Sequence, residues 1–205
     1  MCIRDRVLGT KFNVFWSATD RLSDVTTGSV RVRRAAWNAG FGTYSYPLLN
    51  STTKSLAFNG APGSTYCFST QAQDEVSNVS AWSAERCTTV PLDDRSMTRK
   101  SFKKVTGSSF YLGTAMKAKK KGAKLTLANV KANRIAVIVS KAAKGGKIKV
   151  TFGGTNLGTY SLKGSGSKKL VALKSFGSLK TGTLVIKVVS KTGKVVKIDG
   201  VVIAK

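Results

Sequence analysis

The stretch KIKVTFGGTNLGTYSL, residues 147–162, shows the clearest secondary-structure pattern in the chain. Ile148, Val150 and Phe152 alternate with lysines, and this period of two is the pattern of a strand with one buried face. The glycine pair at 153–154 supplies the positive φ angles that a tight turn requires. The stretch therefore predicts an antiparallel hairpin whose lysines face solvent.

Similar segments continue through the second half of the chain. From residue 107 onward, strand-like runs are joined by glycine turns, and hardly any stretch has the period of a helix. Eight strands are predicted, at 109–116, 123–129, 134–140, 146–152, 157–163, 168–174, 183–190 and 195–204. This pattern predicts a two-sheet jelly roll.

The first half also consists of short apolar runs separated by turn-forming residues. Phe12, Val14 and Trp16 alternate along one run, and Tyr66 and Phe68 share one face of another. Regular turn signals between short alternating runs favour an antiparallel β-sandwich. The whole chain is therefore predicted to be all-β, with one sandwich followed by a jelly roll.

Charge divides the chain into two parts. Residues 1–96 hold ten lysines and arginines against eight acidic residues, whereas residues 97–205 hold 25 against one, Asp199. The resulting net charges of +2 and +24 add up to the +26 of the whole chain. A step of this size indicates two domains, and the proline and acidic pair near its position are typical of a connection. The predicted organisation is a first domain at 7–91, a linker at 92–100 and a lysine-rich second domain at 101–205.

The hexapeptide MCIRDR at 1–6 is typical of translated adapter sequence and is predicted to be an artefact. In that case Cys2 is not a native cysteine. A genuine polar N-terminus is the alternative. The chain contains no apolar run of about 18 residues, so no membrane-spanning helix is predicted.

In the first half, the motifs VFWSATD, SVRVRRA and LAFNGAPGSTYCFSTQAQDEVSNVSAWS follow one another. Over residues 10–90 their order resembles a fibronectin type III domain of the kind found in secreted bacterial proteins. The resemblance implies a sandwich in which Trp16 packs in the core, Tyr66 closes a corner, and the last two strands are neighbours.

In the second half, YLGTAM at 111–116, GKIKV at 146–150, TGTLVIKV at 181–188 and IDGVV at 198–202 occur in order. They resemble the galactose-binding-like, carbohydrate-binding jelly rolls attached to bacterial secreted hydrolases and surface proteins. The resemblance implies a module that often binds glycans, with Asp199 and Gly200 in a turn at the last strand.

Cys67 and Cys87 have three possible roles. A zinc site needs about four ligands, and the chain has no histidine to contribute. A Cys-x-x-Cys redox motif is also absent. On the two neighbouring strands that the fibronectin resemblance implies, a disulfide is the favoured interpretation, with two free buried thiols as the alternative. A disulfide would indicate an oxidising compartment outside the cytoplasm.

The sequence offers little for catalysis. Without histidine, a Ser-His-Asp or Cys-His site cannot form, and Asp199 alone cannot provide a pair of carboxylates in the second domain. Calcium, which is common in jelly rolls of the resembled kind, needs several oxygen ligands. We therefore predict no enzyme activity, no metal and no cofactor.

Two tryptophans and an acidic pair in the first half could be taken as a ligand site. The structural interpretation is favoured for Trp37, Trp82, Asp74 and Glu75. In that interpretation Trp82 covers the edge of the sandwich, and the two acids are solvated in a turn.

The lysines of the second half produce a strong positive field that attracts polyanions. The densest cluster, KAKKKGAK at 117–124, predicts a polyanion-binding site made of Lys117, Lys119, Lys120, Lys121 and Lys124. Lysine lacks the guanidinium fork of arginine and favours adsorption over specific readout. Nucleic acid is disfavoured because stacking aromatics and a recognition helix are missing. A solvated lysine coat that binds nothing is the alternative.

These observations predict a non-catalytic, secreted or surface-associated region, located outside the cell or in the cell wall. The first domain would act as a spacer, and the second would bind an anionic cell-envelope polymer or glycan. We expect a monomer. The alternative is the C-terminal accessory tail of a secreted hydrolase whose catalytic domain lies upstream.

Overall fold

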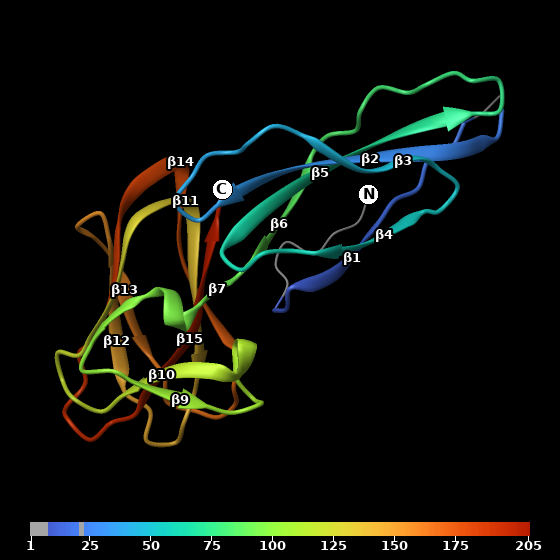
Figure 1. Cartoon of the computed structure of the whole chain (residues 1–205). Helices are drawn as coiled ribbons and strands as arrows, with labels where there is room; N and C mark the ends of the chain where they lie inside the picture. The colour runs from blue at the N-terminus through green and yellow to red at the C-terminus, as the bar shows by residue number, and fades with distance from the viewer. Residues whose placement is uncertain (1–7, 21–22) are drawn as a thin grey trace. The chain divides into compact units, whose positions relative to one another are not determined.

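The computed structural model describes residues 8–20 and 23–205 and divides into two units (Figure 1). The first unit contains the described residues up to Ala36 together with Gly40–Val90. The second contains Trp37–Ala39 and Pro91–Lys205. Both are built of strands, which confirms the all-β prediction. Residues 1–6, predicted to be an artefact, lie outside the described residues, as does Cys2.

The first unit is a sandwich of two antiparallel sheets. One sheet pairs β1 (Lys11–Phe15) with β4 (Ser55–Asn59). The other has the order β3-β2-β5-β6, with the bounds Ser45–Ser51, Val25–Ala36, Ser64–Asp74 and Arg86–Val90. Alternate residues of these strands, together with Trp16 just after β1, form a core that includes Val14, Val30, Val32, Tyr66, Phe68 and Val90.

Tyr66 also fixes the chain just before its own strand. Its hydroxyl oxygen accepts a hydrogen bond from the backbone N–H of Ala61 at 2.7 Å, so the ring is buried while its polar end has a partner. Trp16 is 7% exposed. Trp16 and Tyr66 therefore both belong to the buried core of the first unit.

The second unit contains one nine-stranded antiparallel sheet with two short 3₁₀ helices. The main order is β13-β12-β14-β11-β15-β10-β9, while β7 pairs with β15 and β8 with β11. In chain order the elements are β7 (Leu92–Asp93), η1 (Asp94–Ser96), β8 (Thr98–Lys100), β9 (Lys103–Thr106), η2 (Tyr111–Gly113), β10 (Thr114–Ala118), β11 (Lys124–Ser140), β12 (Lys147–Phe152), β13 (Thr155–Ser161), β14 (Lys169–Val188) and β15 (Val196–Ala204).

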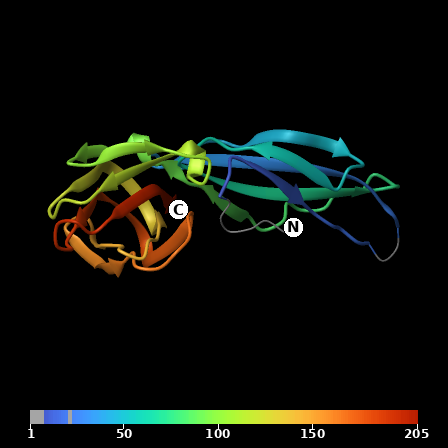
Figure 2. The ribbon, with the colours of Figure 1, turned by 90° about the horizontal axis from the view of Figure 1, so that it is seen from below.

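This sheet curls around one large core, as the turned view shows (Figure 2), and a small second cluster of Ala136, Ile138 and Val202 lies apart from that core. Leu125 in the first half of β11 and Val137 in its second half belong to the same buried cluster, so both halves face one interior. Register shifts between β11 and β14 allow this bend, and Asn129 takes a φ of 60° within it. The result is the jelly-roll sandwich that the strand pattern predicted.

Two details of the predicted strands are wrong. The segments 123–129 and 134–140 fall in the single strand β11, and 168–174 and 183–190 fall largely in the single strand β14. Bulges bend these long strands without a tight turn. A single sequence does not show where such bulges occur. In the predicted strand at 109–116, only the residues from Thr114 onward are strand, as the start of β10, and the helix η2 precedes them.

The segment 92–100, predicted as a linker, is part of the second unit. β7 pairs with β15, and β8 pairs with β11. Leu92 and Met97 are both 4% exposed and belong to the jelly-roll core. The proline and the acidic pair suggested a linker, but the buried apolar residues beside them hold this segment in the sheet.

Both helices of the described residues contain three residues, and neither could cross a membrane.

Candidate functional site

The predicted lysine cluster surrounds the turn between β10 and β11. Lys117 lies in β10, Lys119 and Lys120 follow that strand, and Gly122 takes a φ of 85° in the turn. Lys124 begins β11. The cluster is therefore spread over two strands and a turn.

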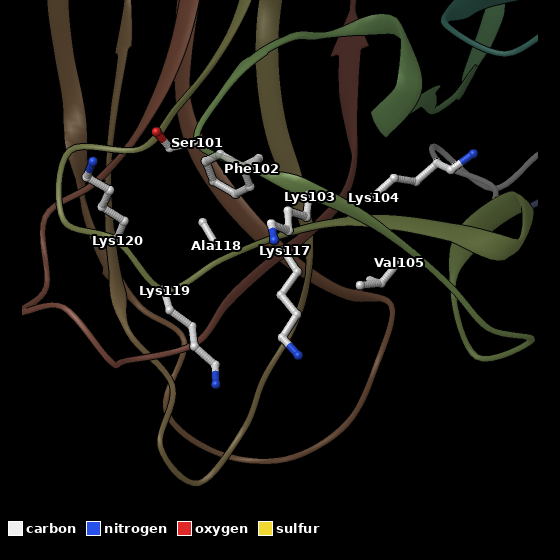
Figure 3. Close-up of a pocket in the computed structure, with 9 residues that line it drawn as sticks. All are labelled: Ser101, Phe102, Lys103, Lys104, Val105, Lys117, Ala118, Lys119 and Lys120. Atoms are coloured by element: carbon white, nitrogen blue, oxygen red, sulfur yellow. The ribbon is translucent and has the colours of Figure 1, made fainter.

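A groove of about 670 Å³ gathers part of this cluster with lysines from another strand (Figure 3). Phe102, Val105 and Ala118 provide its apolar lining, and Phe102 and Ala118 are almost fully buried. We call it the lysine groove, after the residues Lys103, Lys104, Lys117, Lys119 and Lys120. Neither Lys121 nor Lys124 lines it.

Strand pairing creates the groove. β9 lies antiparallel to β10, which places Lys103 directly opposite Lys117 and Lys104 opposite Met116. The dipeptide at 103–104 was visible in the sequence, but its distance from 117–120 in space depends on a pairing that a single sequence does not reveal. The sequence-based prediction therefore missed two of the five lysines.

The carboxylate side chains of residues 91–205 are all buried, at 5% exposure for Asp93 and 0% for Asp94 and Asp199. Asp93 forms an ion pair with Arg95 at 2.7 Å. Asp94 accepts a hydrogen bond from the Thr114 hydroxyl at 2.7 Å. No lysine of this unit forms an ion pair with one of these carboxylates.

Burial governs the protonation of the two inner carboxyls. It raises the pKa of Asp94 and of Asp199 to about 6, and neighbouring carboxylates add to the shift in both cases. Asp199 accepts a hydrogen bond from the backbone N–H of Tyr111 at 2.8 Å. One oxygen of each carboxyl, Oδ2, is buried without a hydrogen-bond partner, which also favours the protonated form.

These positions correct two predictions. Asp199 and Gly200 lie inside β15 at a register shift, not in a turn. The second unit also holds three carboxylates instead of one, because Asp93 and Asp94 belong to it. Asp199 is therefore not isolated in its unit, although it remains fully buried.

The three carboxylates still do not converge as metal ligands. Across residues 8–20 and 23–205, the one group of three candidate ligands within 4.8 Å of one another is Cys67, Glu85 and Cys87. The two sulfurs of that group are bonded to each other and are not thiolates. Neither place fits a calcium or zinc ion by its ligands.

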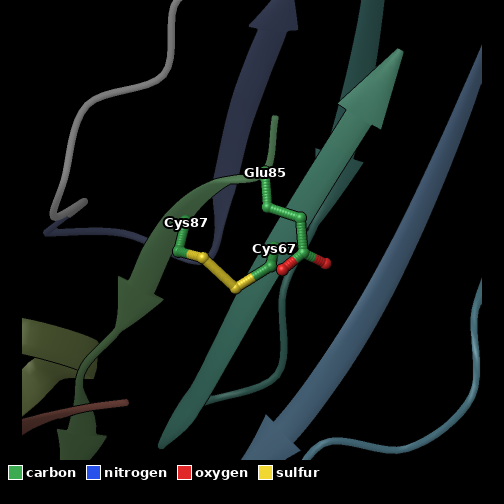
Figure 4. Close-up of side chains that lie close together, drawn as sticks. All are labelled: Cys67, Glu85 and Cys87. Atoms are coloured by element: carbon green, nitrogen blue, oxygen red, sulfur yellow. A yellow bond between two sulfur atoms is a disulfide. The ribbon is translucent and has the colours of Figure 1, made fainter. Parts of the chain in front are cut away.

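Cys67 and Cys87 face each other in the register of β5 and β6 and form a disulfide (Figure 4). Their Cα atoms lie 4.0 Å apart. The preferred prediction for these cysteines is thus confirmed. Beside them, Glu85 pairs with Arg33 and accepts a hydrogen bond from the Tyr44 hydroxyl at 2.7 Å. Burial would raise the pKa of Glu85, but these two donors lower it below its usual value.

The remaining residues singled out in the first half have structural contacts. Trp82 stacks with Arg31, whose guanidinium carbon lies 4.5 Å from the ring centroid. Asp74 is 7% exposed and accepts hydrogen bonds from Ser23 and from the turn that follows it, so it organises this turn instead of being solvated there. Glu75 is exposed.

Trp37 belongs to the second unit. Its side chain packs against the jelly-roll core, and its carbonyl accepts a hydrogen bond from the backbone N–H of Lys131 at 2.9 Å.

No family model and no curated protein matches the chain. Among solved structures, a β-1,3-glucan-binding family 6 carbohydrate-binding module from Bacillus halodurans is 15% identical, with 56% of this chain and 95% of that one aligned at a TM-score of 0.45. A family 6 module from Clostridium cellulolyticum, in complex with xylose, is 16% identical over 56% and 96% at 0.45. A two-domain esterase active on acetylated mannans is 16% identical at 0.46, and the alignment spans 57% of this chain and 37% of the esterase.

Proposed function

We propose that this chain is a non-catalytic, secreted or surface-associated region whose second unit binds an anionic cell-envelope polymer or glycan. The supporting observation is the separation of charge in that unit. Its three carboxylate side chains are buried, whereas most of its lysines are exposed. A polyanion would supply the negative charge that the unit itself does not present.

The first unit would serve as a spacer of fibronectin type III type. Its two sheets of two and four strands, the buried Trp16 and the hydrogen bond from Ala61 to Tyr66 support that proposal. The disulfide supports a location in an oxidising compartment, outside the cell or in the cell wall. We propose that the chain acts as a monomer.

The lysine groove is the part of the surface best suited to begin such binding. Val105 and the aliphatic stems of the lysines can contact the body of a sugar or polymer backbone, while the lysine ammonium groups attract carboxylates or phosphates. An accessory tail of a secreted hydrolase would use the same surface, so this alternative differs only in what lies upstream.

The test is retention of the whole chain on polygalacturonate beads and on isolated cell envelopes across a range of salt concentrations. We expect strong retention at low salt that falls steeply as salt rises, because mobile ions screen the lysines. Neutral cellulose is the control matrix. Absence of retention on both anionic materials at low salt would refute the proposal, and saturable binding to cellulose at high salt would replace it with a neutral glycan-binding function.

A pair of variants tests the groove itself. Changing Lys103, Lys117 and Lys119 to Gln removes three charges from the groove, and changing Lys144, Lys191 and Lys194 to Gln removes three exposed charges elsewhere. We expect the first variant to elute at clearly lower salt than the second. Equal elution would show that net charge alone, and not the groove, determines retention.

A further inference from the structure

Strand register in the jelly roll aligns four lysines across four neighbouring strands. Lys124 in β11 lies directly opposite Lys100 in β8 on one side and Lys187 in β14 on the other. Lys187 in turn lies opposite Lys149 in β12. We call this set the lysine row: Lys100, Lys124, Lys187 and Lys149.

All four side chains lie on the outer face of the sheet. Directly opposed residues of antiparallel strands point to the same face. The residues on either side of Lys187, Ile186 and Val188, are fully buried in the core, so Lys187 points outward. Lys100, Lys124 and Lys187 are exposed and Lys149 is half-buried. The row is therefore open to a ligand.

The row has a cost for the folded chain. Like charges directly opposite each other on neighbouring strands are destabilising, and here this occurs at three successive pairs. No carboxylate among residues 8–20 and 23–205 forms an ion pair with any of the four lysines. A bound polyanion would relieve the repulsion, which is the physical reason to regard the row as a binding surface.

A second row, of mostly uncharged polar residues, accompanies the lysines. Two positions along the same strands, Thr126 lies opposite Thr98 and Val185, and Val185 lies opposite Thr151. Thr151 then faces Asn156 in β13. Hydroxyl and amide groups that can exchange hydrogen bonds with sugar hydroxyls therefore lie beside the positive charges.

We propose that the lysine row binds a linear polysaccharide with a carboxylate on every sugar, lying across the strands β8, β11, β14 and β12. This inference rests on the proposed polyanion-binding function and specifies its ligand class. Opposed side chains are about 5 Å apart at Cβ, so the row presents one positive charge per strand over roughly 15 Å. An extended chain of uronic acids repeats its charge at a similar interval.

The same features disfavour other polyanions. The lysine ammonium attracts carboxylate and phosphate alike, so the hydroxyl and amide groups beside the row, which suit sugar hydroxyls, are what favour a polysaccharide over polyphosphate. Single-stranded nucleic acids are held by aromatic side chains on which bases stack, whereas threonines flank this row. Right-handed twist turns each strand relative to the next, and the flexible lysine stems allow the charges to follow a polymer along that twist.

Two charge-matched variants of the whole chain test this inference. The row variant carries Lys100→Gln, Lys124→Gln, Lys149→Gln and Lys187→Gln. The control variant carries Lys144→Gln, Lys163→Gln, Lys191→Gln and Lys194→Gln, all at exposed positions outside the row. Binding to polygalacturonate is measured by calorimetry at low salt, and thermal unfolding checks that both variants fold.

We expect the row variant to bind about 100-fold more weakly than the wild type, and the control variant to bind only a few-fold more weakly. The row variant should melt no lower than the wild type because its substitutions remove like-charge repulsion. Equal loss in both variants would overturn the row while leaving polyanion binding intact. No binding by the wild type to any polyanion would instead refute the proposed function.

A ligand series tests the charge repeat. Affinity for galacturonate oligomers should rise steeply with length up to about four sugars, one for each strand of the row, and then level off. Methyl-esterified polygalacturonate, which keeps the sugars but loses most charges, should bind weakly. Tighter, row-dependent binding of polyphosphate at equal charge concentration would overturn the uronate assignment, and so would undiminished binding of the esterified polymer.

Discussion

The two units of the chain use their cations in opposite ways. In the first unit, the guanidinium carbon of Arg31 lies 4.1 Å from the ring centroid of Tyr44. The guanidinium carbon of Arg33 lies 4.6 Å from the ring centroid of Phe41, and Arg33 also forms an ion pair with Glu85. In the second unit, the lysine row and the lysine groove contain no ion pair within the described chain. The first unit thus uses these arginines to stabilise its own fold, whereas the second unit presents the lysines of the row and the groove to solvent.

The chemistry of the two side chains explains this difference. The guanidinium group is flat, weakly hydrated and able to stack on a ring while it binds a carboxylate. The lysine ammonium is compact and strongly hydrated, so it remains in water on a strand whose other face is buried. An arginine that already pairs with a carboxylate or an aromatic ring is less available to a ligand than a solvated lysine. This difference favours the second unit as the polyanion-binding unit.

The largest expected effect concerns the disulfide and separates the units by stability. Replacing Cys67 and Cys87 by Ser removes a link between residues 20 apart and should lower the unfolding free energy of the first unit by about 3 kcal/mol. Calorimetry should show one transition moving to lower temperature and the other unchanged. Reductant should reproduce the shift in the wild type. A parallel shift of both transitions would mean that the two units do not unfold independently.

A second prediction concerns the pH dependence of the second unit. The pKa values of Asp94 and Asp199 are about 6 in the folded chain, above the ordinary 3.8. The unfolded chain therefore releases these protons first as pH rises. The stabilising contribution is fully present below about pH 4, is lost between pH 4 and 6, and stays absent above, a change on the order of 3 kcal/mol for each carboxyl.

Thermal unfolding from pH 4 to pH 8 measures this loss in the second transition. Asp199→Asn keeps an oxygen to accept from Tyr111 but cannot ionise, so it should flatten the pH dependence and unfold at a higher temperature than the wild type near pH 7. The chain has no histidine to add a titration in this range. An unchanged pH profile in both Asp199→Asn and Asp94→Asn would disprove the assignment.

The smallest effect comes from changing one cation in each unit. Arg33→Gln should lower the unfolding free energy of the first unit by about 1 kcal/mol, because it breaks the pair with Glu85 and the contact with Phe41. Lys187→Glu should raise that of the second unit by about 0.5 kcal/mol, since the new carboxylate would lie between two lysines on the neighbouring strands. Urea unfolding measures both. The same Lys187→Glu variant should bind polygalacturonate more weakly, and destabilisation in both units would contradict the contrast.

Local patterns predicted much of this architecture. The hairpin at 147–162 is present as β12 and β13, with the glycine pair at its turn. The partnership of Cys67 and Cys87 is also confirmed. The hairpin depends on short-range alternation. The cysteine pair depends on the lack of histidine for a zinc site together with the neighbouring strands that the sequence resemblance implies. The segment 92–100 was misjudged because its composition resembles a linker while its apolar residues are buried by strands far away in sequence.

By itself the sequence determined that the chain is all-β, that a sulfur pair links its first half, and that positive charge accumulates in its second half. Only the tertiary structure decided which charges stand together. Lys100, Lys124 and Lys187 become neighbours through the register of β8, β11 and β14, and Asp94 joins the unit of Asp199 through the pairing of β7 with β15. Strand register aligns segments that are far apart in the sequence, and it depends on bulges and on how the core packs. A single sequence contains these residues but does not show which of them lie opposite one another.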